Sequence, residues 1–184
     1  MPTLTWLRAV DHPELLAAST FRTIRTWAAA QPRVADEVLV AEIDPDLADT
    51  AAMTAAYGLS LAESVNCVLV AGRRAGEEKV AAAAVRATTR ADVNNAVKRL
   101  LDVRKASFLA MDRAVQESGM EYGGITPVGL PSDWPVWVDG AVADTELVCI
   151  GAGIRGAKLL LAGADLLKLP TAERVDHLAR GIAG

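Results

Sequence analysis

The sequence predicts a single α+β domain spanning residues 1–184. Short apolar runs typical of buried strands mix with segments of helical periodicity, without the regular strand–helix alternation of a doubly wound sheet. A chain of this length can bury a full core, and 52% of its residues are hydrophobic. The sequence contains no linker, internal repeat or low-complexity tract, so nothing in it indicates a second domain.

The N-terminal segment, residues 1–35, is expected to be helical. Asp11 and Glu14 resemble a capping box, with a proline early in the helix. Apolar residues then recur at helical spacing, at Ala17, Phe21, Ile24 and Ala28. Pro32 should end this helix, because proline cannot continue the hydrogen-bond ladder.

Residues 37–170 should form the core of the domain, and residues 171–184 a C-terminal helix capped by Thr171. Apolar and alternating runs predict strands at residues 37–44, 64–71, 79–87, 104–106, 136–138, 147–150 and directly after 156. Periodicity, capping residues and closing glycines predict helices at residues 49–57, 93–101, 107–119 and 164–169.

Composition excludes several classes of protein. No stretch approaches the eighteen or so apolar residues that span a bilayer, and we expect no membrane association. The N-terminus lacks the pattern of a signal peptide. Cys67 and Cys149 lie in apparent strands, where we expect reduced core thiols. From these two observations we expect a cytoplasmic protein. The net charge of −4 argues against a tight grip on a long nucleic acid, because such proteins usually carry a basic excess.

Two glycine-rich loops dominate the stretch from residue 119 to residue 161. The first has the sequence G-G-I-T-P-V-G and contains Gly123, Gly124 and Gly129; the second has the sequence G-A-G-I-R-G. Glycine at this density allows a ligand to approach main-chain N–H groups closely. Glycine spacing alone favours the alternative of two hairpin turns.

The order of these motifs resembles that of the YbaK/ProX superfamily. This family comprises free-standing aminoacyl-tRNA deacylases and the editing domain inserted in bacterial prolyl-tRNA synthetases. Its G-x-x-P-x-G loop matches Gly124, Pro127 and Gly129, its later glycine loop matches residues 151–156, and its R-x-A-S segment matches residues 104–107. The resemblance implies a mixed, largely closed β-sheet surrounded by helices, and an enzyme that hydrolyses mischarged aminoacyl-tRNA in trans.

The resemblance also implies a set of site residues. Main-chain N–H groups around Gly123 and Gly124 would stabilise the oxyanion that develops on the aminoacyl carbonyl, and Asn66 would face the ribose or amino group. The substrate-binding residues expected beside them are Thr126, Pro127, Gly129, Gly151, Ala152, Gly153, Arg155 and Lys158. No metal or organic cofactor is implied. The partner is the acceptor end of the tRNA, and an aminoacyl-tRNA synthetase could supply further affinity.

Two positions depart from the family pattern. Active members usually carry a lysine where this chain has Asn66, and an acidic residue where it has Lys158. Asparagine supplies no positive charge, and a charge-assisted hydrogen bond is roughly twice as strong as a neutral one. Lys158 or Arg155 could restore the charge; a solvated hairpin arginine is the alternative for Arg155.

Three functions therefore stay open. Family precedent points to Cys or Ala mischarged on a proline tRNA. A diverged module could instead keep the pocket and bind tRNA or another ligand without catalysis, and a hydrolase of small esters or amides is the third. His12 and His177 are expected at the surface, and a structural zinc site is not expected from this spacing. A strand after the second loop argues against a dinucleotide fingerprint.

Overall fold

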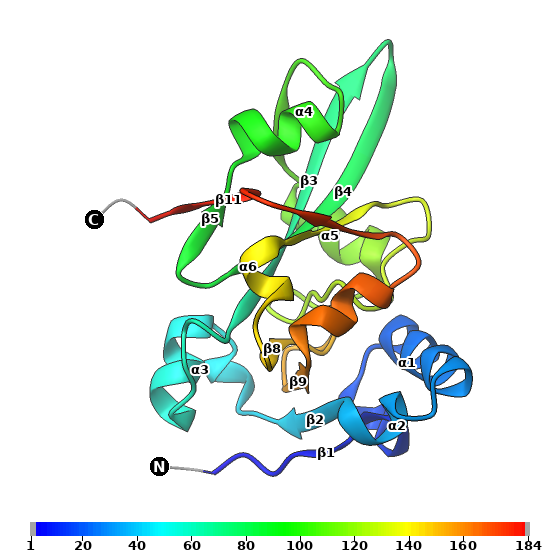
Figure 1. Ribbon diagram of the computed structural model, residues 1–184, viewed down its shortest axis with the longest axis vertical. Coiled ribbons are helices and arrows are strands. Elements are labelled where there is room, and N and C mark those ends of the chain that lie inside the picture. Colours follow the sequence, from blue (N-terminus) through cyan, green and yellow to red (C-terminus); the bar gives the residue numbers. More distant parts are fainter. Residues whose placement is uncertain (1–2, 183–184) are drawn as a thin grey trace.

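The computed structural model describes residues 3–182 as a mixed α+β fold with three sheets. The first sheet has the strand order β1 (Leu7–Arg8), β2 (Leu39–Glu42), β9 (Ala157–Leu161) and β8 (Val148–Gly151). All of its neighbouring strands are antiparallel. It lies at the end of the molecule that carries the N-terminus (Figure 1).

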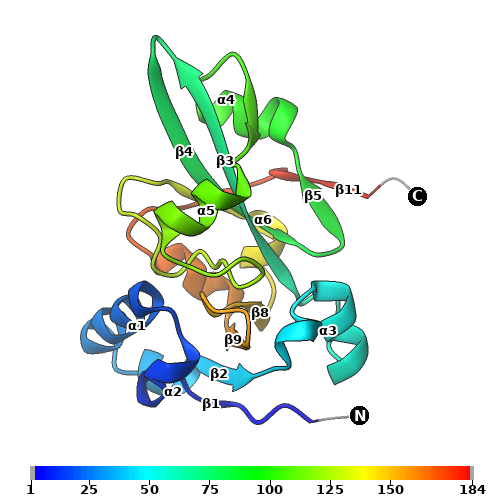
Figure 2. The same ribbon diagram turned by 180° about the vertical axis from the view of Figure 1, so that it is seen from behind.

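The second sheet is built on a long antiparallel hairpin. Its strand order is β10 (Ala172–Val175), β7 (Val136–Asp139), β4 (Glu77–Arg86), β3 (Val65–Arg74) and β6 (Ala106–Phe108). The hairpin turns at Ala75 and Gly76, which both have positive φ. A third, two-stranded sheet pairs β11 (Ala179–Gly181) with β5 (Thr89–Ala91). The tip of the hairpin projects away from the first sheet, as the view from behind also shows (Figure 2).

Short helices fill the connections. The α-helices are α1 (Ala18–Ala30), α2 (Val34–Glu37), α3 (Thr50–Tyr57), α4 (Lys98–Leu100), α5 (Met111–Ser118) and α6 (Gly140–Ala143). The 3-10 helices are η1 (Ala9–Asp11), η2 (Pro13–Leu15), η3 (Pro45–Leu47) and η5 (Gly163–Lys168), and η4 (Val93–Val97) is a π-helical turn. Gly58 and Gly119 end α3 and α5 in the left-handed conformation, as their sequence positions predict.

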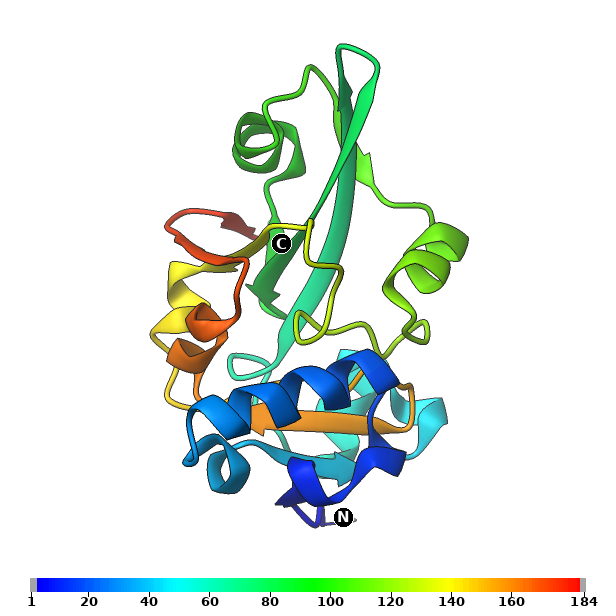
Figure 3. The same cartoon turned by 90° about the vertical axis from the view of Figure 1, so that its right-hand side faces the viewer.

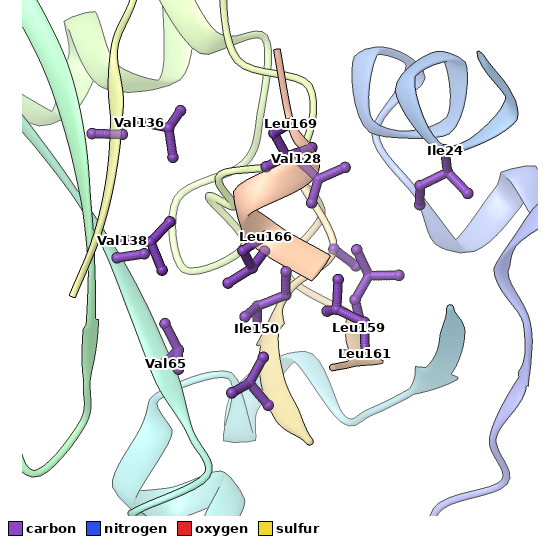
Figure 4. Packing of buried hydrophobic residues seen from close by; sticks show 14 of the residues in the cluster. Ile24, Val65, Val128, Val136, Val138, Ile150, Leu159, Leu161, Leu166 and Leu169 are labelled. Atoms are coloured by element: carbon purple, nitrogen blue, oxygen red, sulfur yellow. The ribbon is translucent and has the colours of Figure 1, made fainter. Parts of the chain in front are cut away.

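One core holds the two larger sheets and α1 together. Valines from β7 and Ile150 from β8 belong to the same buried cluster as Leu159 and Leu161 from β9 and Ile24 from α1 (Figure 4). α1 lies across the first sheet in the side view (Figure 3). A single parallel bridge between Ser64 and Cys149 joins the start of β3 to β8, so the two sheets meet at this point.

The predicted C-terminal helix is wrong. Residues 172–175 form β10, which runs parallel to β7, and residues 179–181 form β11. The Asp139 side chain accepts a hydrogen bond from the Ala179 N–H at 3.0 Å and so fixes this strand segment. Long-range pairing has thus overridden a local helical pattern; residues 183–184 of the prediction lie outside the described residues.

Three other element boundaries differ from the prediction. The N-terminal segment is only partly helical, because residues 7–8 pair as β1 and α1 begins after two 3-10 turns. Ser107 lies in β6 instead of capping a helix, and α5 begins four residues later. The helix predicted at residues 93–101 is a π-helical turn, η4, followed by α4, and Asp92 caps η4 by accepting the Asn95 N–H.

Candidate functional site

A cavity of about 290 Å³ lies where the two sheets meet. Its walls come from the start of α3, the start of β3, the first glycine loop and the paired ends of β8 and β9. The residues that line it are Ala48, Asp49, Thr50, Met53, Ser64, Val65, Asn66, Cys67, Val68, Gly123, Ile125, Cys149, Ile150, Gly151 and Lys158. Asn66, Gly123, Gly151 and Lys158, predicted from distant parts of the sequence, thus come together here.

Lys158 brings a buried positive charge to this cavity. It lies on β9 opposite Gly151 of β8, and only 6% of the residue is exposed. Its Nζ donates one hydrogen bond, to the Ala48 carbonyl at 3.2 Å, and makes no other contact of this kind within residues 3–182. An ammonium group has three donor hydrogens, so two are left for a ligand. Burial lowers the pKa of Lys158, because the charged form loses its hydration.

Asn66 faces the same cavity from β3, and its orientation is set by Thr50. The Thr50 hydroxyl donates to the Asn66 Oδ1 at 2.9 Å. This bond occupies the acceptor side of the amide and leaves the Nδ2 group as the free side, with no partner among the described residues. Asn66, like Lys158, therefore offers hydrogen-bond donors to a ligand.

The first glycine loop offers main-chain donors. Gly123 has φ +82 and lines the cavity together with Ile125. Within residues 3–182, neither of these two residues donates its main-chain N–H to another group. Two free N–H groups beside a cavity are the arrangement that stabilises a developing oxyanion.

Arg155 lies beside this loop but does not line the cavity. Its Nε donates to the Pro45 carbonyl at 2.7 Å, and its main-chain N–H donates to the Glu121 carboxylate at 2.7 Å. A Cβ on Gly123 would lie 2.7 Å from the guanidinium Nη1. Arg155 thus connects both glycine loops to the segment before α3.

Gly124 has a packing role. A Cβ at this position would lie 2.3 Å from the Ile154 carbonyl oxygen, and one on Gly151 would lie 2.3 Å from the Gly124 oxygen. The Gly153 N–H donates to that same Gly124 oxygen at 2.8 Å. The two glycine loops are therefore in backbone contact, and Gly124 allows that contact without lining the cavity.

The five remaining predicted binding residues lie outside the cavity, and Gly129, Ala152 and Gly153 pack against α1 or against Ala17, which precedes it. The Gly129 Cβ position would be 2.6 Å from the Ser19 backbone, and the Gly153 Cβ position 2.4 Å from the Ala17 Cβ. Ala152 accepts the Ala17 N–H at 3.1 Å, and the turn containing the buried Thr126 and Pro127 continues to Val128, whose carbonyl accepts the Thr20 hydroxyl. These five residues, Thr126, Pro127, Gly129, Ala152 and Gly153, are therefore separate from the cavity.

Both cysteines line the cavity as free thiols. Burial raises the pKa of Cys67 to about 12 and that of Cys149 to about 11, so both are protonated at neutral pH. Neither histidine lines the cavity. A cysteine–histidine pair of the kind that activates a thiol nucleophile is thus missing from this part of the described chain.

Sequence reasoning missed Asp49 and Thr50. Asp49 directly precedes α3 and Thr50 is the first residue of that helix, so both are typical of an ordinary helix start. No local signal distinguishes a cavity residue from a capping residue at these positions. Within residues 3–182, no group of three or more His, Cys, Asp or Glu side chains could hold a metal ion. None of the helices in this range is long and apolar enough to cross a membrane.

One known protein family matches the part of the chain that forms the cavity. The family described as the aminoacyl-tRNA editing domain matches residues 44–169, which include every residue lining the cavity. No curated protein matches the sequence.

Several solved structures are similar in fold. One, described as a candidate trans-editing enzyme for prolyl tRNA synthetase, has a TM-score of 0.71 and 20% identity, over 90% of this chain and 99% of that chain. A crystal structure of a hypothetical protein has a TM-score of 0.72 and 22% identity, over 86% and 99%. A scaffold used in computational epitope grafting has a TM-score of 0.68 and 22% identity, over 91% and 100%. These likenesses support the mixed α+β fold.

Proposed function

Because the chain belongs to the family of aminoacyl-tRNA editing domains, we propose that it hydrolyses the ester bond of a mischarged aminoacyl-tRNA in trans. The observation that carries this proposal is one cavity lined by Lys158, Asn66, Gly123 and Ile125, whose ammonium, amide and main-chain N–H groups keep donors without a partner among residues 3–182. These groups are hydrogen-bond donors, and an ester attacked by water develops negative charge on its carbonyl oxygen.

In this proposal the main-chain N–H groups of Gly123 and Ile125 bind the carbonyl oxygen of the ester. They stabilise the tetrahedral oxyanion more strongly than the starting ester, and that difference lowers the barrier. Water is the nucleophile, since both thiols of the cavity stay protonated at neutral pH. Its oxygen bonds to the carbonyl carbon, the ester C–O bond breaks, and its proton passes to the departing ribose oxygen. Gly124 and Gly151 hold the loop in position by allowing the backbone contact described above.

Lys158 and Asn66 bind the acceptor end of the tRNA. Asn66 stands where related enzymes usually carry a lysine, and Lys158 lines the same cavity from β9. The positive charge is therefore supplied from β9 instead of β3. The Asn66 Nδ2 group donates to a ribose oxygen, because its Oδ1 is already bonded to Thr50. Asp49 is the carboxylate of the cavity, and we assign it to the α-ammonium group of the amino acid.

The substrate proposed is a proline tRNA mischarged with Cys or Ala. A similar fold is described as a candidate trans-editing enzyme for prolyl tRNA synthetase. The cavity of about 290 Å³ is small, and Met53, Val68 and Ile125 give it apolar walls suited to a short side chain.

The test is deacylation of a panel of correctly charged and mischarged tRNAs by the wild-type protein. Hydrolysis of Cys- or Ala-tRNA(Pro), with Pro-tRNA(Pro) left intact, supports the proposal. The competing function is a binding module that keeps the pocket without turnover, and the neutral Asn66 at the usual lysine position favours it. Tight binding of the panel without any ester hydrolysis would select that function. Hydrolysis of free aminoacyl esters alone would select a small-ester hydrolase.

A further inference from the structure

Exposed cations gather at the end of the molecule distant from the cavity. The distal basic surface consists of the exposed residues Arg73, Arg74, Arg99, Arg104 and Lys105, together with the half-buried Lys98. It covers the tip of the β3–β4 hairpin, α4 and the loop from α4 to β6, which lie together at one end in both front and back views (Figures 1 and 2). A concentration of positive charge is unexpected in a chain with a net charge of −4.

Four of these cations have no carboxylate partner. Lys98, Arg99, Arg104 and Lys105 form no salt bridge within residues 3–182, whereas Arg74 pairs with Asp102 and Arg73 with Glu78. Several arginines elsewhere are paired with carboxylates. Unpaired exposed cations keep their field available for an anionic partner.

An exposed aromatic residue lies in a groove beside these cations. Phe108 is 65% exposed on β6, and it lines a groove of about 500 Å³ together with Arg73 and Lys105. Arg73 also lines a second groove of about 650 Å³, with Arg74, Arg104 and Asp102, the last of which pairs with Arg74. The only carboxylate lining the first groove is Glu78, and its charge is already compensated by Arg73 and Arg113.

Strand β3 connects this surface to the cavity. Phe108 pairs with Val70, four residues along β3 from Asn66, which corresponds to about 13 Å. Arg73 is seven residues from Asn66 on the same strand, or about 23 Å. A chain leaving the cavity along β3 therefore reaches an aromatic ring first and the cations afterwards.

We infer that the distal basic surface binds the RNA of the substrate, with Phe108 stacking on an unpaired base of the acceptor end and the cations contacting backbone phosphates. Stacking tolerates any base, because every base has a π-face, and arginine and lysine contact phosphates without reading sequence. The inference rests on the proposed function for the identity of the ligand. It also explains how an acidic chain can bind tRNA: the positive charge is local.

The test measures binding of unacylated tRNA by fluorescence anisotropy at several salt concentrations, so it does not depend on ester hydrolysis. Arg104→Gln combined with Lys105→Gln should weaken binding and reduce the slope of log K against log salt by up to about 1.8, because each phosphate contact contributes about 0.9. Phe108→Ala should raise Kd about five- to 150-fold, from the usual stacking contribution per base.

The matched control is Arg22→Gln combined with Arg25→Gln, which removes the same charge from α1 and should leave Kd and the salt slope near wild type. Thermal unfolding of every variant shows that the fold is kept. Three results would each overturn the inference: an equal loss of tRNA affinity in both double variants, wild-type affinity in Phe108→Ala, or no measurable tRNA binding by the wild type. If the wild type binds tRNA through this surface but hydrolyses no ester, the inference holds and the proposed function fails.

Discussion

Replacing Lys158 by methionine should separate activity from stability. The change removes the charge and keeps most of the side-chain volume. A hydrogen bond to a charged group contributes about 1.5–3 kcal/mol, so losing it in the transition state should lower kcat/KM for deacylation about ten- to 150-fold. Lys158→Gln keeps a donor without the charge, so its kcat/KM for deacylation should fall less.

Stability should respond differently to the same change. Lys158 is 6% exposed, and the only hydrogen bond of its side chain within residues 3–182 is to the Ala48 carbonyl. Removing the charge relieves a desolvation penalty of several kcal/mol, which offsets the lost hydrogen bond. The free energy of unfolding should therefore stay near wild type or increase. Lys79→Met is the matched control, since Lys79 also donates to a carbonyl, that of Leu101 at 3.1 Å, and lies outside the cavity.

The pH dependence gives an independent check on Lys158. Burial lowers its pKa in the folded state, so the folded protein loses this proton at a lower pH than the unfolded chain. Between the folded pKa and the unfolded value near 10.4, the unfolded chain binds more protons, and stability rises with pH. In urea unfolding, the free energy of unfolding of the wild type should therefore rise relative to that of Lys158→Met as the pH rises through this window. Parallel stability curves, or a kcat/KM for Lys158→Met equal to that of Lys79→Met, would refute the reasoning.

Three further changes test the remaining parts of the site. Thr50→Val removes the hydroxyl that holds the neighbouring asparagine amide, so kcat/KM should fall about two- to twelvefold, while Thr50→Ser keeps wild-type activity. Gly124→Ala forces a Cβ against backbone atoms and should lower the thermal midpoint by about 2–12 °C, whereas Gly181→Ala, in open space, should not; equal midpoints would contradict the packing role. Cys67→Ser combined with Cys149→Ala should keep most of kcat/KM; a drop to background would instead indicate a thiol nucleophile.

The strands of the core could be predicted because their signal is local. Apolar runs at residues 64–71, 136–138 and 147–150 correspond closely to β3, β7 and β8. The C-terminal segment could not be predicted in this way. Its pattern fits a helix, but β10 is stabilised by pairing with β7, a partner more than thirty residues away in sequence.

The site was predictable only in part, for a physical reason. Asn66 and Lys158 are predicted from alignment with the family pattern, and both line the cavity. The glycines themselves could not be sorted from sequence, because spacing does not show whether a missing side chain makes room for a ligand or for backbone. The structure separates them: Gly123 lines the cavity, whereas Gly124 contacts Ile154 and Gly129 contacts α1.

The most direct test of the proposed function is single-turnover hydrolysis of Ala-, Cys- and Pro-tRNA(Pro) by the wild type and by Lys158→Met. We predict fast hydrolysis of one mischarged species by the wild type, intact Pro-tRNA(Pro), and a rate at least about tenfold lower for the methionine variant. Equal hydrolysis by both proteins would contradict the role assigned to Lys158. Absence of hydrolysis of every species by a folded wild-type protein would contradict the enzyme itself.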